Sequence, residues 1–327
     1  MNDKLPVILR AAWLYYQDGF TQAEIAKQLA VSRATIGRFL ETARETGIVT
    51  FHFHGDSLGA LSLSQEMRAA FGLRDAVVIP GTSEVSEQGQ VNDRIAKGAA
   101  QFLASRMHSG AMLAIGWGDT VSRTLGALSL IYTGRLGLVT MTGGANVYVD
   151  TIIERNIFER SGGSRIQANV VPAPIIASSR ENAVAITGEQ EVRQVLDQSH
   201  SAEFALVGVG TPRIDSTLMK VGYVNSTELG EIAAAGAVGD VLGQFFGSDG
   251  KVLELPIHER RIGLDIQDLR GRENVIAVAG GEAKVQAILA ALYGGFCDTL
   301  VTDEMTAQLL LQSHRSEQAS GRFPMSG

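Results

Sequence analysis

The sequence predicts an α/β protein in two parts, a small N-terminal winged helix-turn-helix and a larger doubly wound, mainly parallel α/β domain. The chain has 327 residues, about twice the size of an ordinary domain, so two domains or one large one are expected. Hydrophobic residues make up 45% of it and charged residues 19%, which favours a well-filled core and excludes a disordered chain. From residue 75 onward, short apolar runs alternate with helical stretches and end in glycine, as in an open parallel sheet.

Several protein classes are excluded by what the sequence lacks. No run approaches the roughly 18 consecutive apolar residues of a membrane helix. The N-terminal segment carries an acidic residue early and has no small-residue cleavage site, unlike a signal peptide. The single cysteine, Cys297, cannot form an intramolecular disulfide or a cysteine-based zinc site. We therefore expect a cytoplasmic protein that does not contact a membrane.

The charge is unevenly distributed along the chain. The formal net charge is −7, but residues 1–55 hold 6 Lys/Arg against 5 Asp/Glu. Between residues 27 and 44, four basic residues stand against Glu41 alone. A small basic region on an acidic body is typical of a protein whose N-terminal part contacts nucleic acid.

The sequence pattern of the N-terminal region predicts three helices. In the first, apolar residues recur at helical spacing (Leu9, Ala12, Trp13 and Tyr16), and Gly19 fits the helix end. Thr21 and Glu24 then fit a capping box, in which each side chain satisfies a backbone amide of the other residue. Ala30 and Val31 turn the chain, and Ser32 suits the N-cap of a third helix ending near Gly47. The apolar faces of the second and third helices are Ile25, Ala26 and Leu29, and Ile36, Phe39 and Leu40.

Two short helices joined by a three-residue turn predict a helix-turn-helix; an ordinary helical hairpin with a solvated basic face is the alternative. The second helix of the motif enters the major groove, where Arg33 suits guanine and Thr35 a thymine methyl group. Phosphate contacts, which fix register without reading sequence, are expected from the other polar residues. The predicted DNA-binding set is Gln22, Lys27, Ser32, Arg33, Ala34, Thr35, Arg38 and Arg44.

Residues 48–54 alternate and predict a wing-like strand at the edge of this domain. His52 and His54 would lie on one face of that strand, a spacing compatible with a metal ligand pair. No carboxylate, thiol or third histidine follows closely, so a wing is the preferred interpretation. No metal and no cofactor are expected.

The larger domain shows seven apolar runs that predict strands. They cover residues 75–80, 111–115, 136–142, 168–174, 204–209, 275–279 and 300–301, and a last helix is expected at 303–311. Before them, residues 58–71 form an amphipathic stretch that predicts a linker or oligomerisation helix. In open parallel sheets, ligands bind beyond the carboxyl ends of the strands, where the glycine turns of this sequence are expected.

Three glycine turns carry residues suited to a ligand. Gly116, Trp117, Gly118, Asp119 and Thr120 precede a helix whose first amides, with the Thr120 hydroxyl, suit a phosphate. Gly280, Gly281 and Glu282 lead to Lys284, which we expect one turn into a helix, where it suits a phosphate or a sugar hydroxyl. The turn at 237–240 ends at Asp240, whose carboxylate suits polyol hydroxyls. A tight strand-to-helix turn without a ligand is the alternative for each. Gly143 and Gly144 complete the predicted effector-binding set.

No hydrolytic or redox motif stands out in the sequence, which has neither a Gly-x-Ser-x-Gly elbow nor a His-Glu-x-x-His pair. The competing hypothesis is a sugar-phosphate isomerase or deaminase with an appended DNA-binding domain. Asp119, Asp240 and Glu282 would then be acid and base candidates. No histidine falls in the glycine turns, so no catalytic residue is predicted.

Taken together, these segments resemble the SorC family of bacterial sugar-responsive transcription regulators. The resemblance rests on WLYYQDGFTQAEIAKQLAVSRATIGRFL, LAIGWGDT, VTMTGG, VVPAPIIASS, ALVGVG, AVGDVLGQFF, VAGGEAKVQAILAAL and LVTDEMTAQLLL, in order along residues 8–312. Within the family, the IPG at 79–81, the PAPIIASS run and GAVGDVLG are most similar to regulators of autoinducer-2 uptake operons.

The resemblance implies a winged helix-turn-helix, an effector domain similar to phosphosugar isomerases and deaminases, and self-association as dimers or tetramers. It implies operator DNA and a phosphorylated sugar, polyol or autoinducer-2 effector as partners. By position, residues 116–120 match the family's phosphate loop, Asp240 its effector-contacting aspartate and Lys284 the lysine of its AGGE-x-K motif. Trp117 stands where relatives often have other residues.

We therefore expect a regulator, with repression favoured over activation, and not an enzyme. The expected domains are a DNA-binding domain at 1–55, a linker or oligomerisation helix at 56–74, an effector domain at 75–313 and a disordered tail at 314–327. The sequence leaves open the effector, the operator, repression against activation, and dimer against tetramer.

Overall fold

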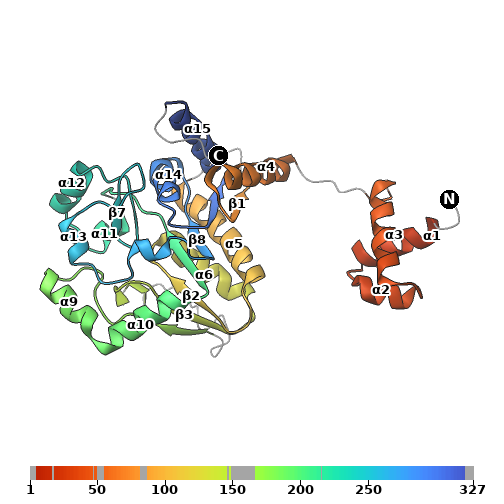
Figure 1. Cartoon of the computed structure of the whole chain (residues 1–327), viewed down its shortest axis with the longest axis horizontal. Coiled ribbons are helices and arrows are strands. Elements are labelled where there is room, and N and C mark those ends of the chain that lie inside the picture. The colour runs from red at the N-terminus through yellow and green to blue at the C-terminus, as the bar shows by residue number, and fades with distance from the viewer. Residues whose placement is uncertain are drawn as a thin grey trace. The chain divides into compact units, whose positions relative to one another are not determined.

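The computed structural model describes residues 5–16, 18–46, 48–49, 55–81, 87–145, 147–148, 166–214 and 216–320 (Figure 1). Backbone contacts divide the chain into two compact units, Met1–Gly55 and Asp56–Gly327.

The N-terminal unit is a bundle of three helices, α1 (Leu5–Tyr16), α2 (Gln22–Gln28) and α3 (Arg33–Glu45). The predicted capping box of Thr21 and Glu24 is confirmed at the start of α2. Gly19 has φ +72, a backbone conformation that glycine adopts without strain, at the end of α1. The core of the unit consists of Ile8, Ala11, Ala12, Ile25, Ala26, Ile36, Leu40 and Ala43.

The structure adds detail to two sequence-based expectations for this unit. The buried face of α1 is Ile8, Ala11 and Ala12, whereas Leu9 and Trp13 are 53% and 60% exposed. Because α1 is apolar on several sides, its helical period alone does not identify the face that meets α2 and α3. Ile48 and Val49 are the first residues of the predicted wing. They form a bend, and the Val49 amide donates to Ala43 O at 2.9 Å. The rest of the wing, residues 50–54 with His52 and His54, lies outside the described residues, as does Gly47.

The larger unit is built on a seven-stranded parallel sheet in the order β1-β9-β8-β5-β2-β3-β4. The strands are β1 (Asp75–Ile79), β2 (Ala111–Ile115), β3 (Leu136–Thr140), β4 (Ile166–Asn169), β5 (Phe204–Gly208), β8 (Val275–Val278) and β9 (Thr299–Asp303). The predicted α/β class with a mainly parallel sheet is confirmed. Six of the seven strands coincide closely with predicted apolar runs.

Helices cover both faces of the sheet. One face packs against α5 (Gln88–Arg106) and α6 (Asp119–Ile131). The other packs against α4 (Gly55–Phe71), α9 (Arg180–Gly188), α10 (Gln190–Ser201), α14 (Val285–Tyr293) and α15 (Glu304–Ala319). Side chains alternate between the two cores along each strand, so that Leu206 of β5 faces α5 and α6 while Ala205 and Val207 face the opposite helices. The predicted helix at 58–71 is α4, and its fully buried Met67 packs into the core of this unit.

Several short elements lie beside the carboxyl edge of the sheet, and part of them encloses a fourth apolar cluster. They are α11 (Thr217–Lys220), α12 (Ser226–Ala234), the strands β6 (Gly239–Val241) and β7 (Gln244–Phe246), α13 (Pro256–Glu259), and the 3-10 turns η2 (Ile266–Leu269) and η3 (Glu282–Lys284). Phe245, Leu218 and Ile257 are buried in this cluster, and Trp117 packs against it. These elements form a cover next to the glycine turns.

In the larger unit, β4 and α15 end at other residues than the sequence predicts. β4 ends at Asn169 instead of reaching residue 174, because Pro172 and Pro174 lack the amide that a strand ladder requires. The predicted disordered tail begins too early, since α15 continues to Ala319. His314 is only 8% exposed and lies 3.0 Å from the Tyr293 hydroxyl, which anchors this last part of the helix. Residues 321–327 lie outside the described residues.

Candidate functional site

The N-terminal site lies at the start of α3. The Ser32 hydroxyl accepts from the Thr35 amide at 3.1 Å, and the hydroxyls of Ser32 and Thr35 are 2.8 Å apart. This cap fixes the first turn of α3, where Arg33 and Ala34 are exposed. The turn before it places Ala30 at φ +50, in the left-handed region.

The remaining residues of the predicted DNA-binding set lie on α2 and farther along α3. Lys27 and Arg38 are exposed, and Gln22 is partly buried. The side chain of Arg44 lies outside the described residues, although its backbone belongs to α3. The exposed basic residues and the buried Ile36 and Leu40 occupy different faces of α3, as the sequence predicts.

In the larger unit, the turn at 116–120 joins β2 to α6. Gly118 is the N-cap with φ +129 and no side-chain cap, so the helix starts at Asp119 without a capping side chain. The first amides of a helix have no partner within it, which makes such a start suitable for an anion. The Gly116 amide donates to Leu206 O of β5 at 2.8 Å and thus serves the fold. Thr120 is 4% exposed.

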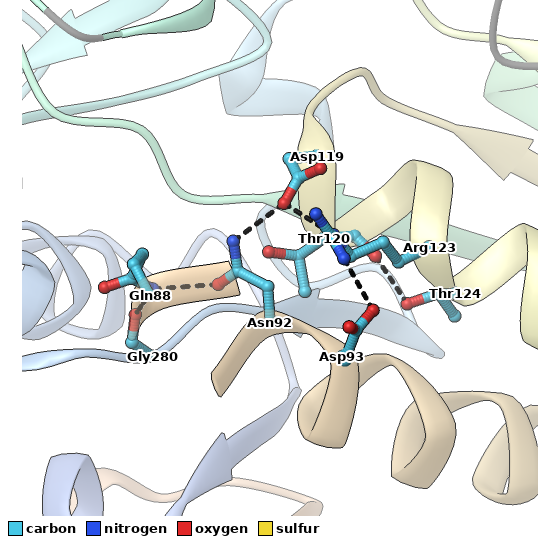
Figure 2. Close-up of polar contacts among 8 residues, drawn as sticks. All are labelled: Gln88, Asn92, Asp93, Asp119, Thr120, Arg123, Thr124 and Gly280. Carbon is cyan, nitrogen blue, oxygen red and sulfur yellow. Dashed lines mark hydrogen bonds and ion pairs between the residues drawn. The ribbon is translucent and has the colours of Figure 1, made fainter. Parts of the chain in front are cut away.

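The Asp119 carboxylate is held by two partners on the α5 side of α6 (Figure 2). Asp119 Oδ2 accepts from Arg123 Nε at 2.7 Å and from Asn92 Nδ2 at 2.8 Å. Arg123 also donates to Asp93 Oδ1 at 2.6 Å, and these carboxylates raise the pKa of its guanidinium. The negative charge at the first residue of α6 is therefore compensated by Arg123.

The turn at 280–284 follows β8. Its backbone is held by side chains of residues 303 and 306, because the Gly281 amide donates to Thr306 Oγ1 at 2.7 Å and to Asp303 Oδ2 at 3.2 Å. Lys284 lies in η3, just before α14, instead of one turn into a helix as expected. This shorter turn directs Lys284 Nζ to Val209 O, 3.0 Å away. Glu282 is exposed.

Asp240 lies in the β6–β7 hairpin and not in a strand-to-helix turn as expected. Leu242 and Gly243 have φ +54 and φ +74, the signature of a type I′ turn. Asp240 Oδ2 accepts from the Gly243 amide at 3.2 Å. Burial raises the pKa of Asp240 to about 6, although that hydrogen bond and the charge of Lys284 act to lower it. The backbones of Gly210 and Asp240 exchange hydrogen bonds of 2.9 and 3.2 Å.

Gly143 and Gly144 use their amides in the fold. The Gly143 amide donates to Ile262 O at 3.0 Å and the Gly144 amide to Ala173 O at 2.7 Å. A Cβ on Gly143 would lie 2.0 Å from Pro174 O, so only glycine permits this approach. Glycine is therefore required at these two positions because they pack against residues 173–175.

Sequence reasoning did not single out three residues near these turns. Gln88 and Asn92 of α5 join the turns at 280–281 and 116–120 (Figure 2). Arg261 donates to Leu242 O at 3.3 Å and to Gly263 O at 3.2 Å, and burial lowers the pKa of Arg261 to about 10. In the sequence, Gln88 and Asn92 look like the solvated start of a helix, and Arg261 like one of a pair of surface arginines. Only tertiary placement distinguishes them.

The sequence profile of a domain family described as "Putative sugar-binding domain" matches residues 56–312. The transcriptional regulators LsrR of Klebsiella pneumoniae and of Escherichia coli K12 are each 36% identical to the chain, over 93% and 94% of its length and 92% and 94% of theirs. The chain belongs to the SorC family of sugar-binding transcriptional regulators. The full-length sorbitol operon regulator SorC from Klebsiella pneumoniae is 25% identical, with a TM-score of 0.69 over 95% of this chain and 100% of that one.

Membership of the SorC family decides between the two hypotheses drawn from the sequence. The chain is a sugar-responsive, DNA-binding regulator and not an isomerase or deaminase. In the described part of the chain, no helix is long and apolar enough to cross a membrane. Across the same residues, no group of three or more His, Cys, Asp or Glu is placed to hold a metal ion.

Proposed function

We propose that the chain is a repressor of a carbohydrate or autoinducer-2 uptake operon and binds operator DNA as a homo-oligomer. Its effector is a phosphorylated sugar or polyol, with phosphorylated autoinducer-2 included in that class. The effector binds at the carboxyl edge of the sheet and changes the affinity of the protein for DNA. Allosteric coupling is typically about 1–3 kcal/mol, or roughly a 5–150-fold change in affinity.

One observation supports this location of the effector site. Three candidate groups contact β5 or the residues that follow it: the Gly116 amide bonds Leu206 O, Lys284 Nζ bonds Val209 O, and Asp240 pairs with Gly210. The start of α6 then offers amides to a phosphate, Lys284 adds positive charge, and Asp240 accepts from hydroxyls. A phosphate on a polyhydroxylated carbon chain matches these three groups.

The effector site is tested by calorimetric titration of the full chain with a panel of phosphorylated sugars and polyols, each paired with its unphosphorylated form. Binding is expected only for phosphorylated members. Lys284→Ala and Asp240→Ala are expected to lose the response to the effector while keeping DNA affinity without it. Lys220→Ala, on α11, is the matched control. Variants at Lys284 and Asp240 that respond like the parent would contradict the assignment.

The DNA site is tested by the exposed arginines of α3. Arg33→Ala is expected to remove the preference for operator over random DNA, because an exposed arginine in the first turn of α3 suits a guanine base edge. Arg38→Ala is expected to weaken binding to all sequences and to lower the salt slope by about 1. Competition binding at several salt concentrations measures both quantities. Unchanged operator selectivity in Arg33→Ala would exclude it as a base reader.

A further inference from the structure

The turns at 116–120 and 280–284 follow two strands that do not pair with each other. They follow β2 and β8, and β5 lies between these two strands. Each turn is tied to β5 or to the residues after it, the first by the Gly116 amide and the second by Lys284 Nζ. In this structure the first residues of α5 lie across them (Figure 2).

A continuous chain of hydrogen bonds runs through that part of α5. Gln88 Nε2 donates to Gly280 O at 2.9 Å and to Asn92 Oδ1 at 2.8 Å. Asn92 Nδ2 donates in turn to Asp119 Oδ2 at 2.8 Å. Since the Asp119 carboxylate only accepts, the orientation of the Asn92 amide is determined by its partners. Gln88 and Asn92 are four residues apart and share a face of the helix.

Packing alone does not require these side chains. Asn92 is 6% exposed between the buried Val91 and Ile95, where an apolar side chain would avoid the cost of burying an amide. The Gln88 side chain also lies close against the turn at 280–284, because a Cβ on Gly281 would be 2.2 Å from Gln88 Oε1. The polar side chains therefore serve the two turns more than the core.

We propose that Gln88 and Asn92 are positioning residues of the effector site. They hold the start of α6 and the turn that carries Lys284 at a fixed separation, so that one phosphorylated ligand engages both. Asn92 also draws the Asp119 carboxylate toward α5 and Arg123, which limits its repulsion of a bound phosphate. This inference rests on the proposed effector site.

Two variants test it in the full chain, with inorganic phosphate and fructose 6-phosphate as calorimetric probes. Asn92→Leu keeps size and charge but removes both bonds of the buried amide. Gln88→Leu changes an exposed residue at the start of a helix, so the variant is expected to fold. Asn92→Leu is expected to weaken binding of the probes by about tenfold, the value of one hydrogen bond to a charged group, and Gln88→Leu, which loses bonds to neutral groups, by about fivefold. DNA affinity without ligand is expected to be unchanged.

The matched control is Asn169→Leu. It breaks another Asn–Gln bond, from Asn169 Nδ2 to Gln198 Oε1 at 2.7 Å, on the edge strand β4. Its affinity for the probes is expected to equal that of the parent. Amide hydrogen exchange at residues 118–121 and 281–284 without ligand supplies an independent readout. Faster exchange at both turns is expected in the Asn92 and Gln88 variants only.

A donor–acceptor exchange distinguishes positioning from a general structural effect. The double variant Asn92→Asp/Asp119→Asn keeps the net charge and allows the same bond with its direction reversed. It is expected to recover most of the affinity that Asn92→Asp alone loses. Unchanged affinity in Asn92→Leu and Gln88→Leu would overturn the inference and leave the effector site standing. A parent chain that binds neither probe nor any phosphorylated panel member would overturn both.

Discussion

At the scale of single residues, Asp240 is a buried carboxyl group of the proposed effector site. It is 6% exposed, and burial raises the pKa of Asp240 to about 6. The carboxylate is the form that accepts two hydroxyl hydrogen bonds, and Lys284 favours it. An arriving polyol would add hydroxyl donors to the Gly243 amide that already bonds this carboxylate.

The raised pKa predicts how stability depends on pH. The native state holds a proton on Asp240 up to about pH 6, whereas an unfolded aspartate loses it near pH 4. The stabilising contribution is therefore fully present below about pH 4 and is lost as the pH rises through about 6. Relative to Asp240→Asn, the parent is expected to lose up to about 3 kcal/mol across this window. Denaturant unfolding at a series of pH values measures it. A difference that stays flat between pH 4 and pH 7 would contradict the raised pKa.

The residues of the effector site differ in how far the sequence identifies them. Gly116–Thr120, Asp240 and Lys284 stand next to glycine turns, which is a local signal. Asn92 and Gln88 have no such signal, because their role depends on α5 lying across β2 and β8. Gly143 and Gly144 carry the same local signal as the other turns, yet the close approach of Pro174 explains them.

At the scale of elements, the junction of β9 and α15 supports the turn at 280–284. Asp303 ends β9 and caps α15, accepting from the Thr306 amide at 3.0 Å and from the Thr306 hydroxyl at 2.5 Å. Both side chains also accept from the Gly281 amide. The next residue, Glu304, accepts from the Gly81 amide at 3.0 Å beyond β1. One junction thus ties α15 to two segments near the site.

Removing this cap is expected to be costly. Asp303→Ala is expected to lower the free energy of unfolding by about 2–3 kcal/mol, because it removes an N-cap and leaves buried donors unsatisfied. Ser179→Ala, which removes the exposed cap of α9, is the control and is expected to cost about 1 kcal/mol. Chemical denaturation of both variants provides the comparison. Equal losses would show that Asp303 acts as an ordinary cap.

Strand positions were the most predictable elements. Buried parallel strands form continuous apolar runs, and β2 begins and ends where its run does. The hairpin that holds Asp240 was less predictable, because Leu242 occupies a left-handed position that usually calls for Gly or Asn. The end of α15 depends on contacts of His314 with Tyr293, which no local pattern reports.

At the scale of the whole molecule, the chain combines an N-terminal unit of three helices with a larger unit that matches a sugar-binding domain family. From a capping box, a basic third helix and repeated units of strand, glycine turn and helix, the sequence predicts a DNA-binding domain followed by an effector domain. Each unit has its own core, and the residues of the proposed effector site belong to the larger one. Regulation therefore requires that effector binding favour one state of the protein over another.

We propose that a phosphorylated ligand of the larger unit controls DNA binding by the smaller one. The most direct measurement is fluorescence anisotropy with DNA from upstream of the chain's own gene, with and without phosphorylated sugars, polyols and phosphorylated autoinducer-2. The account predicts tight, salt-sensitive binding that one class of phosphorylated ligand weakens by roughly 5–150-fold. Lys284→Ala should bind the same DNA and not respond. Specific DNA binding that ignores every phosphorylated ligand, or no specific DNA binding, would contradict the account.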